Sequence, residues 1–211
     1  ERYMPYTIET IAERISARRV GDTPATIDWL LTDSRSLSFP EETLFFALTT
    51  KRNDGARYIP DLYSRGVRNF VVSKEAYKWV ESGQLAMSNS DMLAVNFLVV
   101  ANPLKALQKL AEQHREQFQI PVIGITGSNG KTIVKEWLHQ LLSPERAIVR
   151  SPRSYNSQIG VPLSVWQMNG QSELAIFEAG ISEMGEMRAL QNIIKPTIGI
   201  LTNIGGAHQE N

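Results

Sequence analysis

The segment Gly124–Thr132, GITGSNGKT, places a lysine and a threonine directly after closely spaced glycines. In a phosphate-binding loop, glycines let backbone N–H groups turn toward phosphate oxygens, the lysine adds a cation, and the threonine hydroxyl can ligate magnesium. Five residues separate Gly124 from Gly130, one more than in the usual consensus. The alternative is a glycine-rich turn followed by Lys-Thr by chance. The residues predicted to bind the phosphates of ATP with Mg²⁺ are Gly127, Ser128, Asn129, Gly130, Lys131 and Thr132.

Two other side chains could hold a cation near this loop. Glu178 ends the apolar segment LAIFE, and His208 follows a Gly-Gly turn after a second apolar segment. In open α/β sheets, the carboxyl ends of parallel strands face the ligand crevice. A carboxylate suits Mg²⁺, whereas a histidine is chemically a second-best ligand. The alternatives are a helix-capping carboxylate for Glu178 and an ordinary loop histidine for His208.

The first hundred residues alternate between strand-like and helix-like segments, which predicts a small α/β unit. Thr7 is expected to cap a helix that begins at Ile8. A further helix is expected over 56–64. The expected strands cover 27–32, 43–48, 69–72 and 95–100.

Asn102-Pro103 marks a boundary, because Asn is a good N-cap and Pro is favoured at the first helical position. We therefore place an N-terminal domain at 1–101 and a second domain at 102–211. On the helix that follows Pro103, His114 lies on the apolar face and is expected to be packed. The remaining elements predict a parallel-sheet P-loop domain: strands over 121–126, 147–150, 173–178 and 198–202, and helices over 132–142 and 184–194.

The helix after the phosphate loop carries apolar residues at helical spacing, which predicts that this face packs on the sheet. These residues are Ile133, Val134, Trp137, Leu138 and Leu141.

Composition sets limits on the class of protein. The 211 residues contain 22 Lys plus Arg and 22 Asp plus Glu, so a net charge of zero gives no reason to expect nucleic acid or a membrane surface as a partner. There is no cysteine, which excludes disulfides and thiolate chemistry. No apolar run reaches the length of a membrane span, so a cytoplasmic location is the default expectation. Met4 could be a native start.

Five segments resemble the Mur ligase superfamily, whose members are ATP-dependent amide-forming enzymes of peptidoglycan synthesis. Within it, Ile-Gly-Val-Pro-Leu and Ala-His are most similar to the ligases that add D-alanyl-D-alanine to UDP-N-acetylmuramoyl-tripeptide. Ala56 stands where the family pattern has a histidine, which puts that histidine's role in doubt. The five segments are the loop Gly124–Thr132, Thr32–Arg35 with Asn53–Gly55, Asn156–Leu163, Glu178–Glu186 and Thr202–His208.

The resemblance implies a role for each candidate residue. It makes Lys131, Glu178 and His208 catalytic, and it makes Thr132, Glu178 and His208 the magnesium ligands. Substrate contacts fall to Ser34 and Arg35 for the uridine diphosphate, and to Asn156 and Ser157 for the muramoyl or peptide part. The alternatives are a turn with a solvated arginine for the first pair and a simple loop cap for the second. In the reaction that it implies, ATP phosphorylates a peptide carboxylate, and the amine of D-alanyl-D-alanine attacks the acyl phosphate.

Three alternatives remain open at this point. Another ligase of the superfamily, such as a folylpolyglutamate synthase, is disfavoured by the Asp-Ser-Arg segment ahead of the loop. A nucleotide-sugar-binding fragment without activity is a second alternative. A P-loop switch protein is a third, but the chain has no Asn-Lys-x-Asp segment. The resemblance also implies that the 211 residues are a fragment with a truncated ATPase domain, which we expect to be inactive in ligation by itself.

Overall fold

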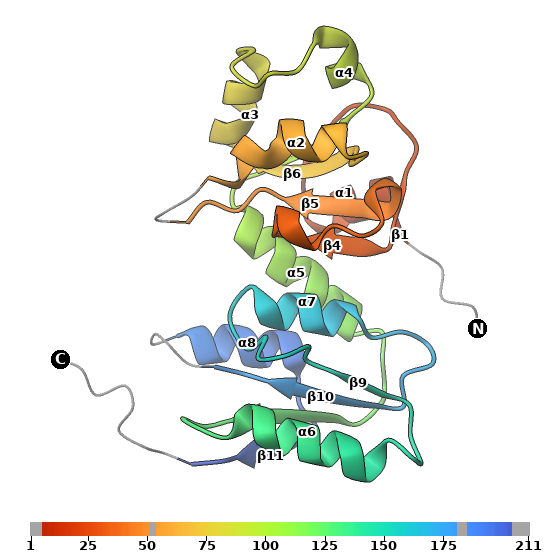
Figure 1. The fold of residues 1–211 in the computed structure, drawn as a ribbon, viewed down its shortest axis with the longest axis vertical. Helices are drawn as coiled ribbons and strands as arrows, with labels where there is room; N and C mark the ends of the chain where they lie inside the picture. The colour runs from red at the N-terminus through yellow and green to blue at the C-terminus, as the bar shows by residue number, and fades with distance from the viewer. Residues whose placement is uncertain (1–5, 51–53, 181–184, 204–211) are drawn as a thin grey trace, which may run out of the picture. The chain divides into compact units, whose positions relative to one another are not determined.

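The computed structural model describes residues 6–50, 54–180 and 185–203. The chain divides into two compact units, Met4–Leu110 and Ala111–Asn211. The boundary between them falls inside helix α5 (Pro103–Arg115). Both units are α/β (Figure 1). Within the described ranges, no helix is long and apolar enough to cross a membrane.

The first unit is built on a five-stranded sheet in the order β2-β7-β6-β5-β4. Strands β4 to β7 run parallel, and β2 joins β7 antiparallel. The predicted strand over 27–32 is two strands, because the chain changes partners at Asp28. The first of them, β3, pairs antiparallel with β1 in a separate small sheet, and the second, β4, joins the main sheet. The bounds are β1 Tyr6–Thr7, β2 Arg18–Val20, β3 Thr26–Ile27, β4 Trp29–Leu31, β5 Thr43–Phe46, β6 Asn69–Ser73 and β7 Asn96–Val100.

Four helices accompany this sheet: α1 (Ile8–Arg14), α2 (Ile59–Ser64), α3 (Lys74–Glu81) and α4 (Asn89–Leu93). Thr7 caps α1 through its side chain, as predicted. Helix α3 was not predicted, because its apolar face is short: Ala76, Tyr77 and Val80 are its buried residues, and half of its eight residues are charged. The core beside α2 and α3 contains Phe70, whose ring contacts the rings of both Phe45 and Phe97.

The second unit has a four-stranded parallel sheet in the order β11-β8-β10-β9. Strand β8, which leads into the glycine-rich loop, is central, so the carboxyl ends of β10 and β11 flank that loop. The strands are β8 Val122–Thr126, β9 Ile148–Arg150, β10 Leu174–Glu178 and β11 Ile198–Leu201, and the helices after α5 are α6 Lys131–Leu142, α7 Gly160–Trp166 and α8 Glu186–Ile194.

Helices cover both faces of this sheet (Figure 1). Alternate strand residues face α6 on one side and α7 with α8 on the other, as the two-residue period of a strand requires. Next to the second face, His114 is fully buried, and its Nε2 lies 2.7 Å from the Met168 carbonyl oxygen. The prediction that His114 is a packed histidine is confirmed.

The predicted apolar face of α6 was partly wrong. Val134 and Leu138 pack against the sheet. Ile133, Trp137 and Leu141 are 55%, 62% and 74% exposed, because their side of the helix is turned away from the strands of the described sheet.

Phe70→Ala should test the core of the first unit. Phe70 is fully buried between two other rings, so we expect a loss of about 3–5 kcal/mol in the free energy of unfolding, measured by urea denaturation. The control is Phe39→Ala, since Phe39 is 53% exposed and stacks on Trp29 alone among the described rings, at 5.1 Å. We expect the control to cost about 0.5–1.5 kcal/mol. Equal losses would contradict the packing described here.

Candidate functional site

The phosphate loop connects β8 to α6 and depends on two glycines. Gly127 has φ +130° and Gly130 has φ +81°, a region that other L-residues rarely adopt. The turn brings Lys131 to the first position of α6, where its Nζ donates to the Gly127 carbonyl oxygen at 2.7 Å. The first N–H groups of a helix have no partners within the helix, and the helix dipole favours an anion there. The start of α6 therefore offers N–H donors and a lysine charge of the kind that bind phosphate.

The residues that follow β11 hold the other side of the loop. The Ser128 and Asn129 N–H groups donate to the backbone and side-chain oxygens of Asn203, at 3.1 and 2.9 Å. Thr202 Oγ1 donates to the Asn129 carbonyl oxygen at 2.6 Å. A Cβ on Gly127 would lie 2.1 Å from Thr202 Oγ1, so the close approach requires glycine. These contacts of Thr202 and Asn203 were not predicted, although both residues lie in a segment that the sequence singled out.

Glu178 stands at the carboxyl end of β10, fully buried, directly beside the start of α6. The Thr132 hydroxyl donates to Glu178 Oε1 at 2.9 Å. Lys135 Nζ lies 2.8 Å from the other oxygen, Oε2, and forms an ion pair with it, although the angles are not those of a hydrogen bond. The structure thus brings together two of the three predicted magnesium ligands, and it adds a lysine that was not predicted.

The sequence did contain one signal for Lys135. Lys135 follows Thr132 by three residues, and this spacing places both side chains on one side of α6. A lysine among the apolar residues of a helix is ordinarily solvated, so this spacing did not suffice to identify it.

The donor set near the loop fits a hard cation. Thr132 Oγ1 and Glu178 Oε1 are oxygen ligands of the kind that Mg²⁺ prefers, and they lie within one hydrogen bond of each other. Within 6–50, 54–180 and 185–203, no group of three or more His, Cys, Asp or Glu side chains forms a metal cluster. Magnesium bound by few protein ligands keeps waters and substrate phosphates as the others, which agrees with this sparse set. His208, the third predicted ligand, lies outside the described residues.

Asn156 and Ser157 lie in the loop between β9 and α7. The Asn156 carbonyl oxygen accepts from the Gly180 N–H at 2.7 Å, just beyond Glu178. Ser157 Oγ accepts from the N–H groups of Ile159 and Gly160 and so caps the start of α7. The capping alternative therefore holds for Ser157, and its contact with substrate stays a prediction.

Ser34 and Arg35 belong to the first unit, in the short 3-10 helix Ser34–Ser36 that follows β4. The Arg35 side chain is 88% exposed and pairs with Asp33 at 2.7 Å. Hydrogen bonds from the Arg35 guanidinium and then from its N–H hold the pKa of Asp33 below its usual range. Ala56, the residue that departs from the family pattern, is fully buried, and its methyl group cannot take the place of a histidine's ring nitrogens.

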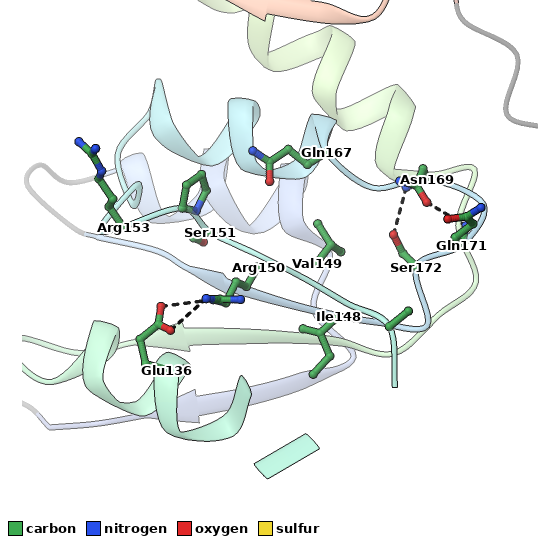
Figure 2. Close-up of a pocket in the computed structure, with 12 residues that line it drawn as sticks. Glu136, Ile148, Val149, Arg150, Ser151, Arg153, Gln167, Asn169, Gln171 and Ser172 are labelled. Atoms are coloured by element: carbon green, nitrogen blue, oxygen red, sulfur yellow. Dashed lines mark hydrogen bonds and ion pairs between the residues drawn. The ribbon is translucent and has the colours of Figure 1, made fainter. Parts of the chain in front are cut away.

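A cleft of about 570 Å³ follows the edge strand β9 in the second unit (Figure 2). Its polar groups pair with one another: Arg150 with Glu136 at 3.3 Å, and Asn169 N–H with Ser172 Oγ at 3.1 Å. Burial raises the pKa of Glu136, but the hydrogen bond and charge of Arg150 outweigh burial and lower it. No predicted site residue in the described part of the chain lines this cleft, so the cleft does not coincide with the predicted site.

Comparison with known proteins agrees with this geometry. Residues 125–211 match the Mur ligase middle domain, and curated relatives match most of the chain. The UDP-N-acetylmuramoyl-tripeptide–D-alanyl-D-alanine ligase of Borreliella burgdorferi is 39% identical over 169 residues, which are 80% of this chain and 35% of that protein. The ligase of that name from Bacillus subtilis is 30% identical over 97% of this chain and 42% of its own.

The chain belongs to the Mur ligase family.

Solved Mur ligase structures share the fold. MurF from Acinetobacter baumannii is 26% identical, with a TM-score of 0.80 over 97% of this chain and 42% of its own. MurF ligase from Thermotoga maritima in complex with ADP is 28% identical, with a TM-score of 0.68 over 86% of this chain and 38% of its own. This chain thus spans less than half the length of these Mur ligases.

A pair of glycine substitutions should separate two features of the Mur ligase loop. Gly130→Ala meets no atom within 4 Å, so it should cost only the strain of positive φ, about 1–2 kcal/mol. Gly127→Ala has a φ of +130°, farther from the left-handed helical region and so at least as strained, and its Cβ also collides with Thr202. We expect its loss to be larger by about 1–3 kcal/mol, measured by urea unfolding. A Gly127→Ala chain as stable as Gly130→Ala would show that Thr202 does not hold the loop.

Proposed function

We propose that this chain supplies the UDP-sugar-binding domain and part of the ATP-binding domain of a peptide ligase. That ligase adds D-alanyl-D-alanine to UDP-N-acetylmuramoyl-tripeptide. The observation that carries the proposal is the 2.9 Å contact between the Thr132 hydroxyl and the Glu178 carboxylate at the end of the phosphate loop. The name shared by the curated relatives favours this ligase over a folylpolyglutamate synthase.

The proposed reaction needs a leaving group on a peptide carboxylate. A carboxylate oxygen takes the γ-phosphoryl group of ATP, ADP departs, and the amine of the second substrate then attacks the acyl carbon and releases phosphate. Lys131 and the N–H groups at the start of α6 would stabilise charge on the transferring group. For this purpose, the Lys131 ammonium must leave the Gly127 carbonyl oxygen that it contacts in this structure.

Thr132 and Glu178 would hold Mg²⁺, and the resemblance adds His208 as a third ligand. When bound, the ion supplies charge neutralisation of the phosphate oxygens. Placing the carboxylate in a buried position increases its interaction with a cation, because few waters compete there.

The proposal assigns residues 1–101 to the uridine-diphosphate end of the substrate, and it assigns 102–211 to ATP. Arg35 supports the first assignment, since its exposed guanidinium can donate paired hydrogen bonds to a pyrophosphate. Asn156 and Ser157 would face the muramoyl or peptide part, since their loop is bonded to Gly180 beyond the Glu178 strand.

Lys131→Ala tests the nucleotide site. A hydrogen bond to a charged group contributes about 1.5–3 kcal/mol, so we expect ATP affinity to fall roughly 10- to 100-fold with an unchanged fold. Calorimetric titration of ATP with Mg²⁺ measures the affinity, and circular dichroism checks the fold. The matched control is Lys195→Ala, because Lys195 also lies in the second unit but pairs with Glu112 and Glu116. Native ATP affinity in the Lys131→Ala chain would refute the loop assignment.

Binding of UDP-N-acetylmuramic acid tests the first unit. We expect NMR chemical-shift changes at Ser34 and Arg35, and roughly 10-fold weaker binding in Arg35→Ala because a charge-assisted pair is lost. Arg57→Ala, a change at another exposed arginine of the same unit, serves as the control. Shift changes confined to the surroundings of Asn156 would reassign the substrate site to the second unit.

A further inference from the structure

Lys135 is a fully buried lysine whose ammonium joins three separate segments. It lies 2.8 Å from Glu178 Oε2 on β10, and it donates to the carbonyl oxygens of Ser151, at 2.8 Å, and of Arg153. Its Nζ also lies 3.5 Å from Glu136 Oε1 on its own helix. Lysine is almost never fully buried unless it is paired, and these neighbours supply the pairing.

The carboxylate of Glu178 is consequently divided between two neighbours. Oε1 accepts from Thr132, and Oε2 faces Lys135. The backbone of the same residue is fixed as well, because the Glu178 N–H donates to Ser151 Oγ at 3.0 Å. Only Oε1 is thus turned toward the phosphate loop.

Lys135 also determines the path of the loop after β9. Figure 2 shows Ser151 and Arg153 in this loop, and Arg153 has φ +48°, which is unusual for a residue other than glycine. Neither acceptor is a side chain, so the ammonium holds the backbone itself. Three residues past Arg153, Asn156 is bonded to Gly180.

We propose that Lys135 is a positioning residue that couples the cation-binding carboxylate to the loop proposed to contact the substrate. Its ammonium directs Glu178 Oε1 toward the phosphate loop and anchors the backbone of 151–153 at the same point. This inference rests on the proposed function, because it gives Glu178 the role of holding Mg²⁺. A purely structural ion pair would stabilise the fold and leave the effect of Mg²⁺ on nucleotide binding unchanged.

The first test compares ADP binding with Mg²⁺ and with EDTA by calorimetry. In Lys135→Met, we expect the gain in ADP affinity due to Mg²⁺ to fall by about tenfold, as is typical when a residue that orients a metal ligand is removed. ADP affinity in EDTA should stay within about twofold, because Lys131 and the loop are intact. Lys195→Met is the control, since it removes a surface ion pair in the same unit. A Lys135→Met chain that keeps the full Mg²⁺ effect would overturn the inference.

The second test does not depend on nucleotide. Hydrogen exchange followed by mass spectrometry should show at least tenfold faster exchange across 151–157 in Lys135→Met, and no change there in Lys195→Met. Unchanged exchange would overturn the anchoring of the loop. If the unaltered chain does not bind ADP but Lys135→Met still speeds exchange across 151–157, the proposed function is refuted. The anchoring of the loop by Lys135 then stands.

A double variant separates the role of Lys135 from general damage to the fold. Lys135→Met leaves a buried carboxylate without its cation, and Glu178→Gln removes that charge. We therefore expect Lys135→Met/Glu178→Gln to unfold at a higher urea concentration than Lys135→Met. Equal midpoints would show that the two side chains are not coupled. Should Lys135→Met not fold, the exchange across 151–157 is compared between the double variant and Glu178→Gln, with the same expected difference.

Discussion

The buried carboxylate of Glu178 is the point on which the second unit depends. A charged group at zero exposure is stable there because the Thr132 hydroxyl and the Lys135 ammonium contact its two oxygens, while the Ser151 hydroxyl accepts from the Glu178 N–H. These partners come from α6 and from the loop after β9, so that with β10 three segments meet at this residue. Removal of any of them would leave a polar group buried without full compensation, so the carboxylate specifies how the three segments meet.

The order of the parallel strands explains why the segments can meet at all. Strand β8 lies between β10 and β11, so the loop at its carboxyl end has Glu178 on one side and Thr202 with Asn203 on the other. The glycine at 127 permits the approach on the β11 side, where any Cβ would collide with Thr202. The loop is therefore held from both sides in a conformation that its own sequence permits but does not impose.

The first unit presents a different electrostatic situation. Its charged pair of Asp33 and Arg35 is largely exposed, and such a pair contributes little to stability. An exposed arginine oriented by a neighbouring carboxylate is instead suited to exchange partners for an incoming anion. The second unit thus uses a buried charge to fix its structure, whereas the first keeps its arginine accessible.

The sequence by itself determined the α/β class, the phosphate loop and the carboxylate at the end of β10. These depend on local patterns: apolar runs of strand length, glycines at fixed spacing and a Lys-Thr pair at a helix start. The sequence also placed His114 in the core and Asn102 at the cap of α5. Asn102 Oδ1 accepts a hydrogen bond from the Lys105 N–H.

Tertiary structure alone decided which residues support the loop and which side of α6 is covered. Lys135 is buried, while Trp137, two positions later, is exposed; hydrophobicity predicts the reverse. The reason is that a buried ammonium needs acceptors from Ser151, Arg153 and Glu178, whose positions are set by long-range strand pairing. Such strand pairing is fixed by the packing of the whole sheet, and the spacing of residues along the chain does not predict it.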